Sequence, residues 1–166
     1  MVFDQSMGTF EYLVEYFLAP FNYPSAVPEL IPLILGVFIL EVYFEKTNAQ
    51  RLERADPIGN ALLWLTTGLA LVLEYNASGR EMLVVYFLII MGSGVLLVEF
   101  LEEWRERFRF FHSFITPIYS IAYLSVILVA TPLEINSRSI EAALVFMGID
   151  VVFFYFWKKT VPVPNR

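Results

Sequence analysis

Long apolar runs separated by short polar connectors dominate the pattern of hydrophobic and polar positions along the chain. Five runs extend over roughly 17–25 residues, the length at which a helix rising 1.5 Å per residue crosses a hydrocarbon layer of about 30 Å. Each run must be a helix, because lipid offers no hydrogen-bond partner to a strand edge or loop. The pattern therefore predicts an all-α, polytopic membrane bundle with five transmembrane helices, at residues 27–46, 57–75, 82–102, 110–131 and 140–157.

A shorter amphipathic pattern precedes the first run. Its apolar residues recur at the spacing of one helix face, with acidic side chains opposite, and they are Phe10, Leu13, Val14, Phe17 and Leu18. We therefore expect residues 1–26 to form an extracellular tail with a short amphipathic helix lying flat on the membrane surface.

Composition supports a membrane protein and removes several kinds of site. Apolar residues make up 58% of the chain, well above their share in an ordinary soluble domain. The mean hydropathy is +0.63. The absence of cysteine excludes disulfides and thiolate ligands, and a single histidine excludes a multi-histidine metal cage. No cofactor is predicted, although a bound cation is compatible with the sequence. We expect the protein to lie in a lipid bilayer and to bind no nucleic acid.

Basic residues predict the orientation of the bundle. Nine of the eleven Lys and Arg residues lie after the first, third and fifth runs, namely Lys46, Arg51, Arg54, Arg105, Arg107, Arg109, Lys158, Lys159 and Arg166. Because basic residues concentrate on the cytoplasmic side, we expect the N-terminus outside and the C-terminus in the cytoplasm. The expected location is the plasma membrane of a prokaryote.

The sequence also contains an apparent tandem repeat. GVFILEVYFE at 36–45 aligns without gaps with GVLLVEFLEE at 94–103, and the match continues with a two-residue offset. We therefore predict a first two-helix unit at 27–81, a second at 82–139, and a fifth helix with a cytoplasmic tail at 140–166. Seven polar or special positions agree: Gly36 with Gly94, Glu41 with Glu99, Glu45 with Glu103, Pro57 with Pro117, Glu74 with Glu134, Asn76 with Asn136 and Glu81 with Glu141.

Two repeated carboxylate pairs are candidates for an ion or proton site. Glu41 and Glu99 lie about five residues inside the predicted cytoplasmic ends of their helices, roughly 7 Å deep at 1.5 Å per residue. Glu45 and Glu103 follow one turn later, and like charges at this spacing repel. Three kinds of compensation fit this repulsion: a bound cation or shared proton, the arginines of the adjoining connectors, or hydration at the membrane interface.

Asp150 is the second candidate, since it falls near the middle of the fifth run. An ionisable group at that depth indicates function by default. Residues at similar depth predict one polar layer, and they are Thr66, Thr67, Ser93 and Ser120. The alternative is a protonated aspartic acid that joins helices by donating to a hydroxyl or a carbonyl.

Prolines and glycines add two further expectations. Asn60 and Ser120 each follow a repeated proline by three residues, where a freed backbone carbonyl could coordinate a cation. Glycines within the runs are expected to permit close approach of helices, at Gly36, Gly59, Gly68, Gly92, Gly94 and Gly148.

Three classes of function follow from these residues. The first is a small channel or transporter for a cation or proton, expected as a homo-oligomer because five helices barely enclose a pathway. The second is a non-transporting membrane subunit or scaffold that binds partner membrane proteins. The third, an intramembrane or lipid-processing enzyme, has little support because no catalytic spacing such as GxSxG or HExxH occurs.

Overall fold

The computed structural model describes residues 7–38, 56–75, 77–101 and 115–160. These residues are helical apart from short connections and contain no strand, which confirms the predicted all-α class. The elements are α1 (Thr9–Asn22), the 3-10 helix η1 (Pro24–Ala26), α2 (Val27–Phe38), α4 (Asp56–Tyr75), α5 (Arg80–Phe100), α7 (Ile115–Ala130) and α8 (Ser137–Thr160).

Three of these helices are long and apolar enough to cross a membrane. The qualifying segments are Ile58–Tyr75 in α4, Arg80–Phe100 in α5 and Ser137–Trp157 in α8. Shorter apolar helices cover Pro24–Val37 and Thr116–Ala130. The predicted first and fourth runs extend into residues 39–46 and 110–114, which lie outside the described residues. The number of spans and the orientation in the membrane therefore stay predictions.

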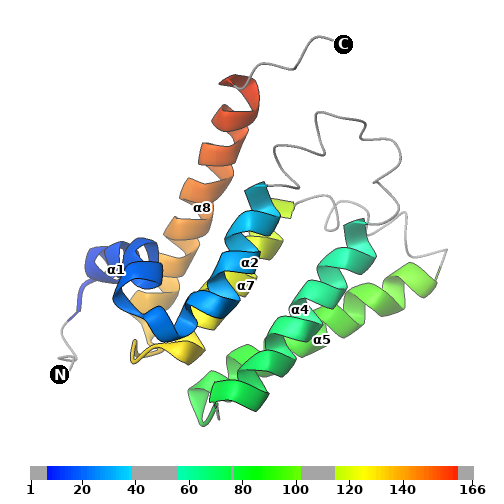
Figure 1. Ribbon diagram of the computed structural model, residues 1–166, viewed down its shortest axis with the longest axis horizontal. Coiled ribbons are helices and arrows are strands. Elements are labelled where there is room, and N and C mark those ends of the chain that lie inside the picture. The colour runs from blue at the N-terminus through cyan, green and yellow to red at the C-terminus, as the bar shows by residue number, and fades with distance from the viewer. Residues whose placement is uncertain (1–6, 39–55, 76, 102–114, 161–166) are drawn as a thin grey trace.

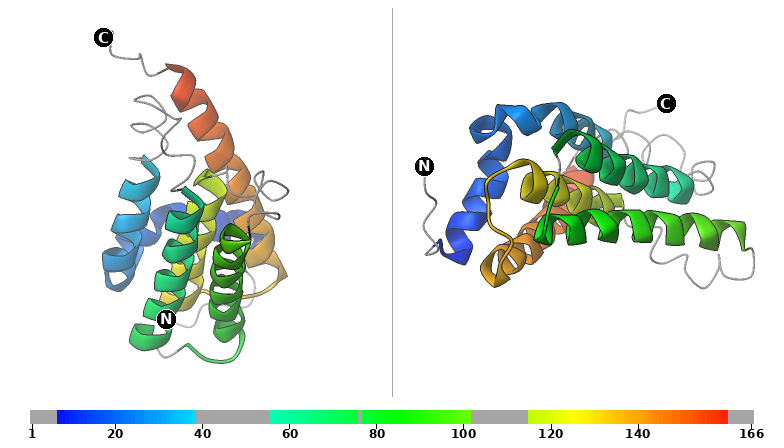
Figure 2. Two further views of the ribbon diagram at one scale, coloured as in Figure 1. Left: turned by 90° about the vertical axis from the view of Figure 1, so that its right-hand side faces the viewer. Right: turned by 90° about the horizontal axis from the view of Figure 1, so that it is seen from below.

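Helix α7 occupies the centre of the bundle and contacts α2, α4, α5 and α8. Figure 1 shows α4 and α5 side by side as an antiparallel hairpin, α2 beside α7, and α8 rising beyond the other helices. The two views of Figure 2 show the same arrangement, with α1 lying across α8. Because helices surround α7, its residues from Thr116 onward are almost all buried, and this helix carries much of the core.

The outward faces of the long helices are apolar. A water-soluble protein rarely exposes so much contiguous apolar surface, whereas lipid covers it without cost. Exposed side chains on these faces include Leu62, Leu69 and Leu73 of α4, Leu83, Ile90 and Leu97 of α5, and Leu144, Val152 and Phe156 of α8. Their exposure agrees with a membrane protein.

Glycines admit close helix contacts at three of the six predicted positions. A Cβ at Gly36 would lie 2.6 Å from the Tyr119 ring, one at Gly68 2.9 Å from the Ile89 side chain, and one at Gly92 2.8 Å from the Ala61 carbonyl oxygen. At the other three glycines, no described residue lies within 4 Å of the added atom, so the expectation was wrong for Gly59, Gly94 and Gly148. Sequence shows that a glycine is in a helix, but not which way it faces.

Helix α1 forms as predicted but packs with a different face. Tyr12, Tyr16 and Ala19 are its buried residues and lie against the bundle. Most of the expected apolar stripe points away from it, with Phe10 73% and Leu18 43% exposed, whereas Phe17 lies against Phe146 of α8. The stripe is therefore available to lipid, while tyrosines, which can bond to buried carbonyl groups, join α1 to α7 and α8.

The tandem repeat stays a prediction, although the contacts have a related pattern. Exchanging the two predicted units would map the contact between α4 and α5 onto that between α7 and α2, and both contacts occur. The aligned glycines do not share an environment, since Gly36 meets Tyr119 and Gly94 meets no described neighbour. Any symmetry is therefore limited to the course of the helices.

Candidate functional site

A groove of about 440 Å³ lies between α1, α2, α7 and α8. We call it the Asp150 groove. Helix α1 contributes Phe17, Pro20 and Phe21, and α2 contributes Leu33, Ile34 and Val37. The remaining lining residues are Tyr119, Ser120 and Tyr123 of α7 and Phe146, Ile149, Asp150, Phe153 and Phe154 of α8. The groove is therefore predominantly apolar and aromatic.

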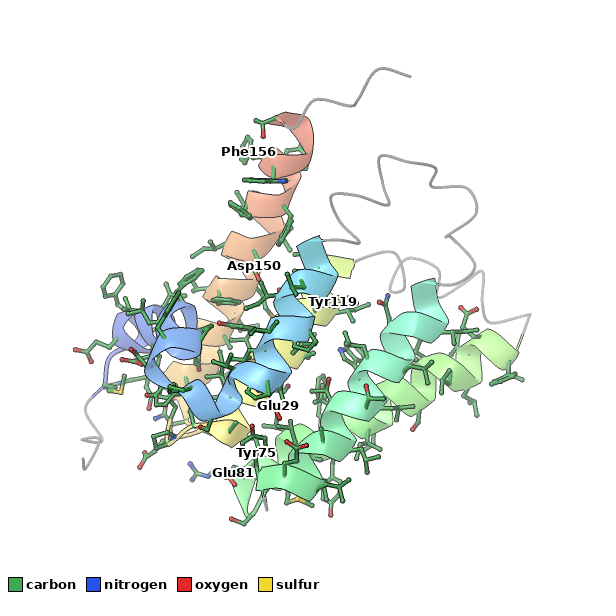
Figure 3. The ribbon with its side chains drawn as sticks, in the orientation of Figure 1. Glu29, Tyr75, Glu81, Tyr119, Asp150 and Phe156 are labelled. Carbon is green, nitrogen blue, oxygen red and sulfur yellow. The ribbon has the colours of Figure 1, made fainter. Side chains whose placement is uncertain are left out.

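Asp150 and Ser120 meet in the wall of this groove. Ser120 Oγ lies 2.7 Å from Oδ2 of Asp150 and 2.8 Å from the backbone oxygen of Thr116. Figure 3 shows Asp150 on the side of α8 that faces α2 and α7. The structure thus brings together two of the five residues that were predicted to lie at similar depth.

The Ser120 hydroxyl suits both protonation states of the carboxyl group. When Asp150 is ionised, the single proton of the hydroxyl is donated to the carboxylate. When Asp150 is protonated, its own O–H is donated to Ser120 Oγ, which then donates to Thr116. The same atoms therefore satisfy the neutral and the charged form without a large rearrangement.

Aromatic side chains form half of the described groove lining. The rings of Tyr123 and Phe146 stack with their centroids 5.5 Å apart, and Phe17 lies against Phe146 at 4.7 Å. Phe153 and Phe154 meet edge to face at 5.3 Å. This wall is preformed, because each ring is already in contact with another ring.

Buried tyrosine hydrogen bonds hold α1 against α7 and α8. Tyr16 donates to the Ser139 carbonyl at 2.8 Å, and Tyr123 donates to the Tyr16 carbonyl at 2.8 Å. Asn136 donates to the hydroxyl of Tyr12 at 2.8 Å. Burial raises the pKa of Tyr16 above its ordinary value of 10.0, and the hydrogen bond to Ser139 offsets only part of this rise. The hydroxyl of Tyr16 therefore stays protonated and continues to donate well above neutral pH.

Among the described residues that line the groove, Asp150 supplies the only carboxyl group, and none is Lys, Arg or His. Its carboxyl group accepts one described hydrogen bond, through Oδ2, from Ser120. When Asp150 is ionised, the described lining therefore carries one negative charge in apolar surroundings. Such a charge attracts a proton or another cation.

The remaining members of the predicted polar layer lie elsewhere. Thr66 is exposed on α4, and its hydroxyl lies 2.8 Å from the Leu62 carbonyl in its own helix. Thr67 is half-buried on α4, and Ser93 is exposed on α5. The groove is lined by other helices, so the structure joins only Ser120 to Asp150.

The repeated glutamates give a partial outcome. Helix α5 ends at Phe100, which places Glu99 in its last turn, half-buried, rather than five residues inside the helix as predicted. Glu41, Glu45 and Glu103 lie outside the described residues, as do the arginines of both connectors. Whether these acids meet a cation or an arginine stays open.

Asn60 is buried on α4 and only 4% exposed. Its side-chain nitrogen has no hydrogen-bond partner among the described residues. A buried amide without a partner costs free energy. The predicted candidate is therefore a strained position, and it lies outside the Asp150 groove.

A contact between a tyrosine and a carboxyl group occurs where the start of α2 meets the end of α4. The Tyr75 hydroxyl lies 2.8 Å from Oε2 of Glu29 and 2.9 Å from the Ser25 carbonyl oxygen (Figure 3). Among the described residues, no group of three or more His, Cys, Asp or Glu could hold a metal ion.

Sequence reasoning missed the aromatic lining of the groove. Tyr119, Tyr123 and Phe146 lie within apolar runs, where an aromatic residue is as easily a lipid contact as part of a site. The available signal was the location of Tyr119 and Tyr123 beside Ser120, on the same helix as a predicted polar candidate.

No known protein family matches the chain, and neither does any characterised protein or solved structure. The apolar helices and their exposed faces indicate a helical membrane protein. Its candidate site is a carboxyl group in an aromatic groove.

Proposed function

We propose that the protein transports protons or cations across a membrane, and that Asp150 is the group that carries them. The observation behind this proposal is the Asp150–Ser120 pair in the groove wall, on a helix long enough to cross a membrane. An ionisable residue within such a helix is costly and tends to serve a pathway or a proton relay.

The chemistry of the pair favours transport over a purely structural role. An amide or a hydroxyl would join α7 to α8 without an ionisable group. Asp150 instead lines a groove, and Ser120 can donate to it or accept from it. Proton uptake and release therefore need no new partner for the carboxyl group.

Transport in our proposal takes place in a homo-oligomer in the plasma membrane. The groove is partly open along one side, so a single copy supports the site without enclosing a continuous path. Neighbouring copies would complete the walls. Cross-linking in membranes, followed by measurement of the mass of the products, tests the oligomer.

The test of transport is proton flux in liposomes. Purified protein is reconstituted around a pH-sensitive dye, a potassium gradient with valinomycin sets the voltage, and proton entry is followed. The comparison is wild type, Asp150→Asn, Ser120→Ala and the control Glu141→Gln. Glu141 is exposed on the same helix and accepts a hydrogen bond from Thr9 at 3.1 Å.

We expect wild type and Glu141→Gln to admit protons and Asp150→Asn to match protein-free liposomes. Ser120→Ala should retain part of the flux, because it removes the partner and leaves the carboxyl group. The proposal fails if Asp150→Asn conducts like wild type. It also fails if folded wild type moves no proton, sodium or potassium under any gradient.

A further inference from the structure

The walls of the Asp150 groove are suited to a particular kind of cation. We propose that the groove binds a small organic cation with an apolar body, such as a substituted ammonium or phosphonium ion, with its charge against Asp150. Transport of that cation rests on the function proposed above, whereas its binding can be measured without transport.

Charge complementarity is the first support. Among the described lining residues, no basic side chain balances the carboxyl group of Asp150. Its described hydrogen bond is to a neutral hydroxyl, so no described residue of the groove supplies a counter-charge to an ionised Asp150. An occupant that is positively charged would supply it.

The rings of the lining favour an organic cation over a metal ion. Half of the fourteen lining residues are aromatic, and the face of an aromatic ring attracts a cation within about 6 Å. A metal ion would lose most of its hydration shell for one carboxyl group and one hydroxyl, whereas calcium takes about 6–8 oxygen ligands. An organic cation needs no such shell, and its apolar body replaces water at the walls.

The size and depth of the groove indicate a small free molecule rather than a membrane lipid. Its volume of about 440 Å³ is that of a pocket for a drug-sized ligand. Asp150 lies ten residues before the last residue of α8, Thr160, and thirteen after the first, Ser137. At 1.5 Å per residue these separations are about 15 and 20 Å, too deep for a lipid headgroup.

Contacts within the walls hold the groove in shape without an occupant, which favours binding of a compact body. Buried hydrogen bonds through Tyr16 and Tyr123 hold α1 against α7 and α8, and the lining rings already touch one another. A preformed site loses little conformational freedom when it is filled.

Two probes of matched shape and opposite charge test the inference. Tetraphenylphosphonium and tetraphenylborate each carry four phenyl rings, so they share size and apolar surface and differ in charge. Equilibrium dialysis measures the binding of each probe to the full-length protein in a neutral detergent. The variants are Asp150→Asn, Ile34→Trp, which narrows the groove without changing its charge, and the control Glu141→Gln. Circular dichroism and gel filtration establish that each is folded.

We expect wild type and Glu141→Gln to bind about one tetraphenylphosphonium per chain. Asp150→Asn should bind it at least about tenfold more weakly, because removing one partner of a desolvated charge pair is costly. Ile34→Trp should also weaken it, and tetraphenylborate should not bind. The inference is overturned if wild type does not bind the cation, if Asp150→Asn binds it equally well, or if the anion binds as tightly.

The results separate this inference from transport. If protons move through wild type but not Asp150→Asn, and tetraphenylphosphonium does not bind, the organic-cation inference fails and proton transport stands. If tetraphenylphosphonium binds through Asp150 but no cation crosses the liposome membrane, transport fails and the binding site stands. If Ile34→Trp does not fold, the comparison of Asp150→Asn with Glu141→Gln still decides the outcome.

Discussion

Replacing Gly92 and Gly94 separately by alanine tests the contact between α4 and α5. At position 92 the new Cβ would lie 2.8 Å from the Ala61 carbonyl oxygen and 2.9 Å from the side chain of Leu65, across the helix interface. The Ala61 carbonyl is part of the backbone and cannot rotate away as a side chain can, so α4 and α5 must move apart. Such overpacking costs about 1–3 kcal/mol, offset by at most about 1 kcal/mol from the better helix propensity of alanine.

Position 94 is the matched control, because no described residue lies within 4 Å of a Cβ added there. We expect Gly94→Ala to be neutral or more stable by up to about 1 kcal/mol, and Gly92→Ala to be less stable by about 1–2 kcal/mol. Unfolding in mixed detergent micelles with rising dodecyl sulfate, followed by tryptophan fluorescence, measures both. Equal stability of the two variants, or a more stable Gly92→Ala, would refute the geometry of the α4–α5 interface.

Three further substitutions test individual contacts by the same unfolding assay. Tyr16→Phe leaves the Ser139 carbonyl without its donor and should cost about 1–3 kcal/mol near neutral pH. Burial raises the pKa of Tyr16 in the folded protein, so its stabilising effect is complete below pH 10 and declines as the pH rises above it. As the pH rises above 10, wild type should therefore lose more stability than Tyr16→Phe. Equal losses in the two proteins would contradict this. Trp64→Phe removes a 3.0 Å hydrogen bond to the Ile118 carbonyl and should loosen α4 from α7 by about 1–3 kcal/mol. Asn60→Leu should be neutral or stabilising, because the buried amide nitrogen has no described partner, and a clear loss of stability would show that it has one.

The predicted runs and the observed helices α4, α5 and α8 agree to within three residues at each end. Helix α8 extends three residues beyond each end of the predicted 140–157 run, and α5 begins at Arg80 and ends at Phe100 against a predicted 82–102. Hydropathy locates such helices because the bilayer constrains their length. It does not show which helix is central, so the near-complete burial of α7 was not predicted.

The face that a helix presents is harder to predict in a membrane than in water. In a soluble protein the apolar stripe of an amphipathic helix faces the core. In α1, Phe10 and Leu18 instead face outward, and Tyr12 and Tyr16 are buried. Because lipid is apolar, a helix face that contacts lipid and a face that contacts the core show the same periodic pattern of apolar residues.

The candidate site was predictable in depth but not in direction. Asp150 and Ser120 were assigned similar depths from their separate helices, and they form a hydrogen bond. Thr66 and Ser93 were assigned similar depths too, yet they are exposed on α4 and α5. Counting residues gives the height of a side chain along a helix, whereas its rotation about the helix axis depends on contacts that only the folded chain provides.

The hydrogen bonds that hold α1 have a consequence for biosynthesis. Tyr16 donates to a carbonyl 123 residues later in the chain, and the Tyr16 carbonyl accepts from a residue 107 positions later. At about 5–20 residues per second, a ribosome needs roughly 6–25 seconds to make the intervening chain. Helix α1 is therefore made well before its partners, and the groove that it lines is completed only after α8 has been made.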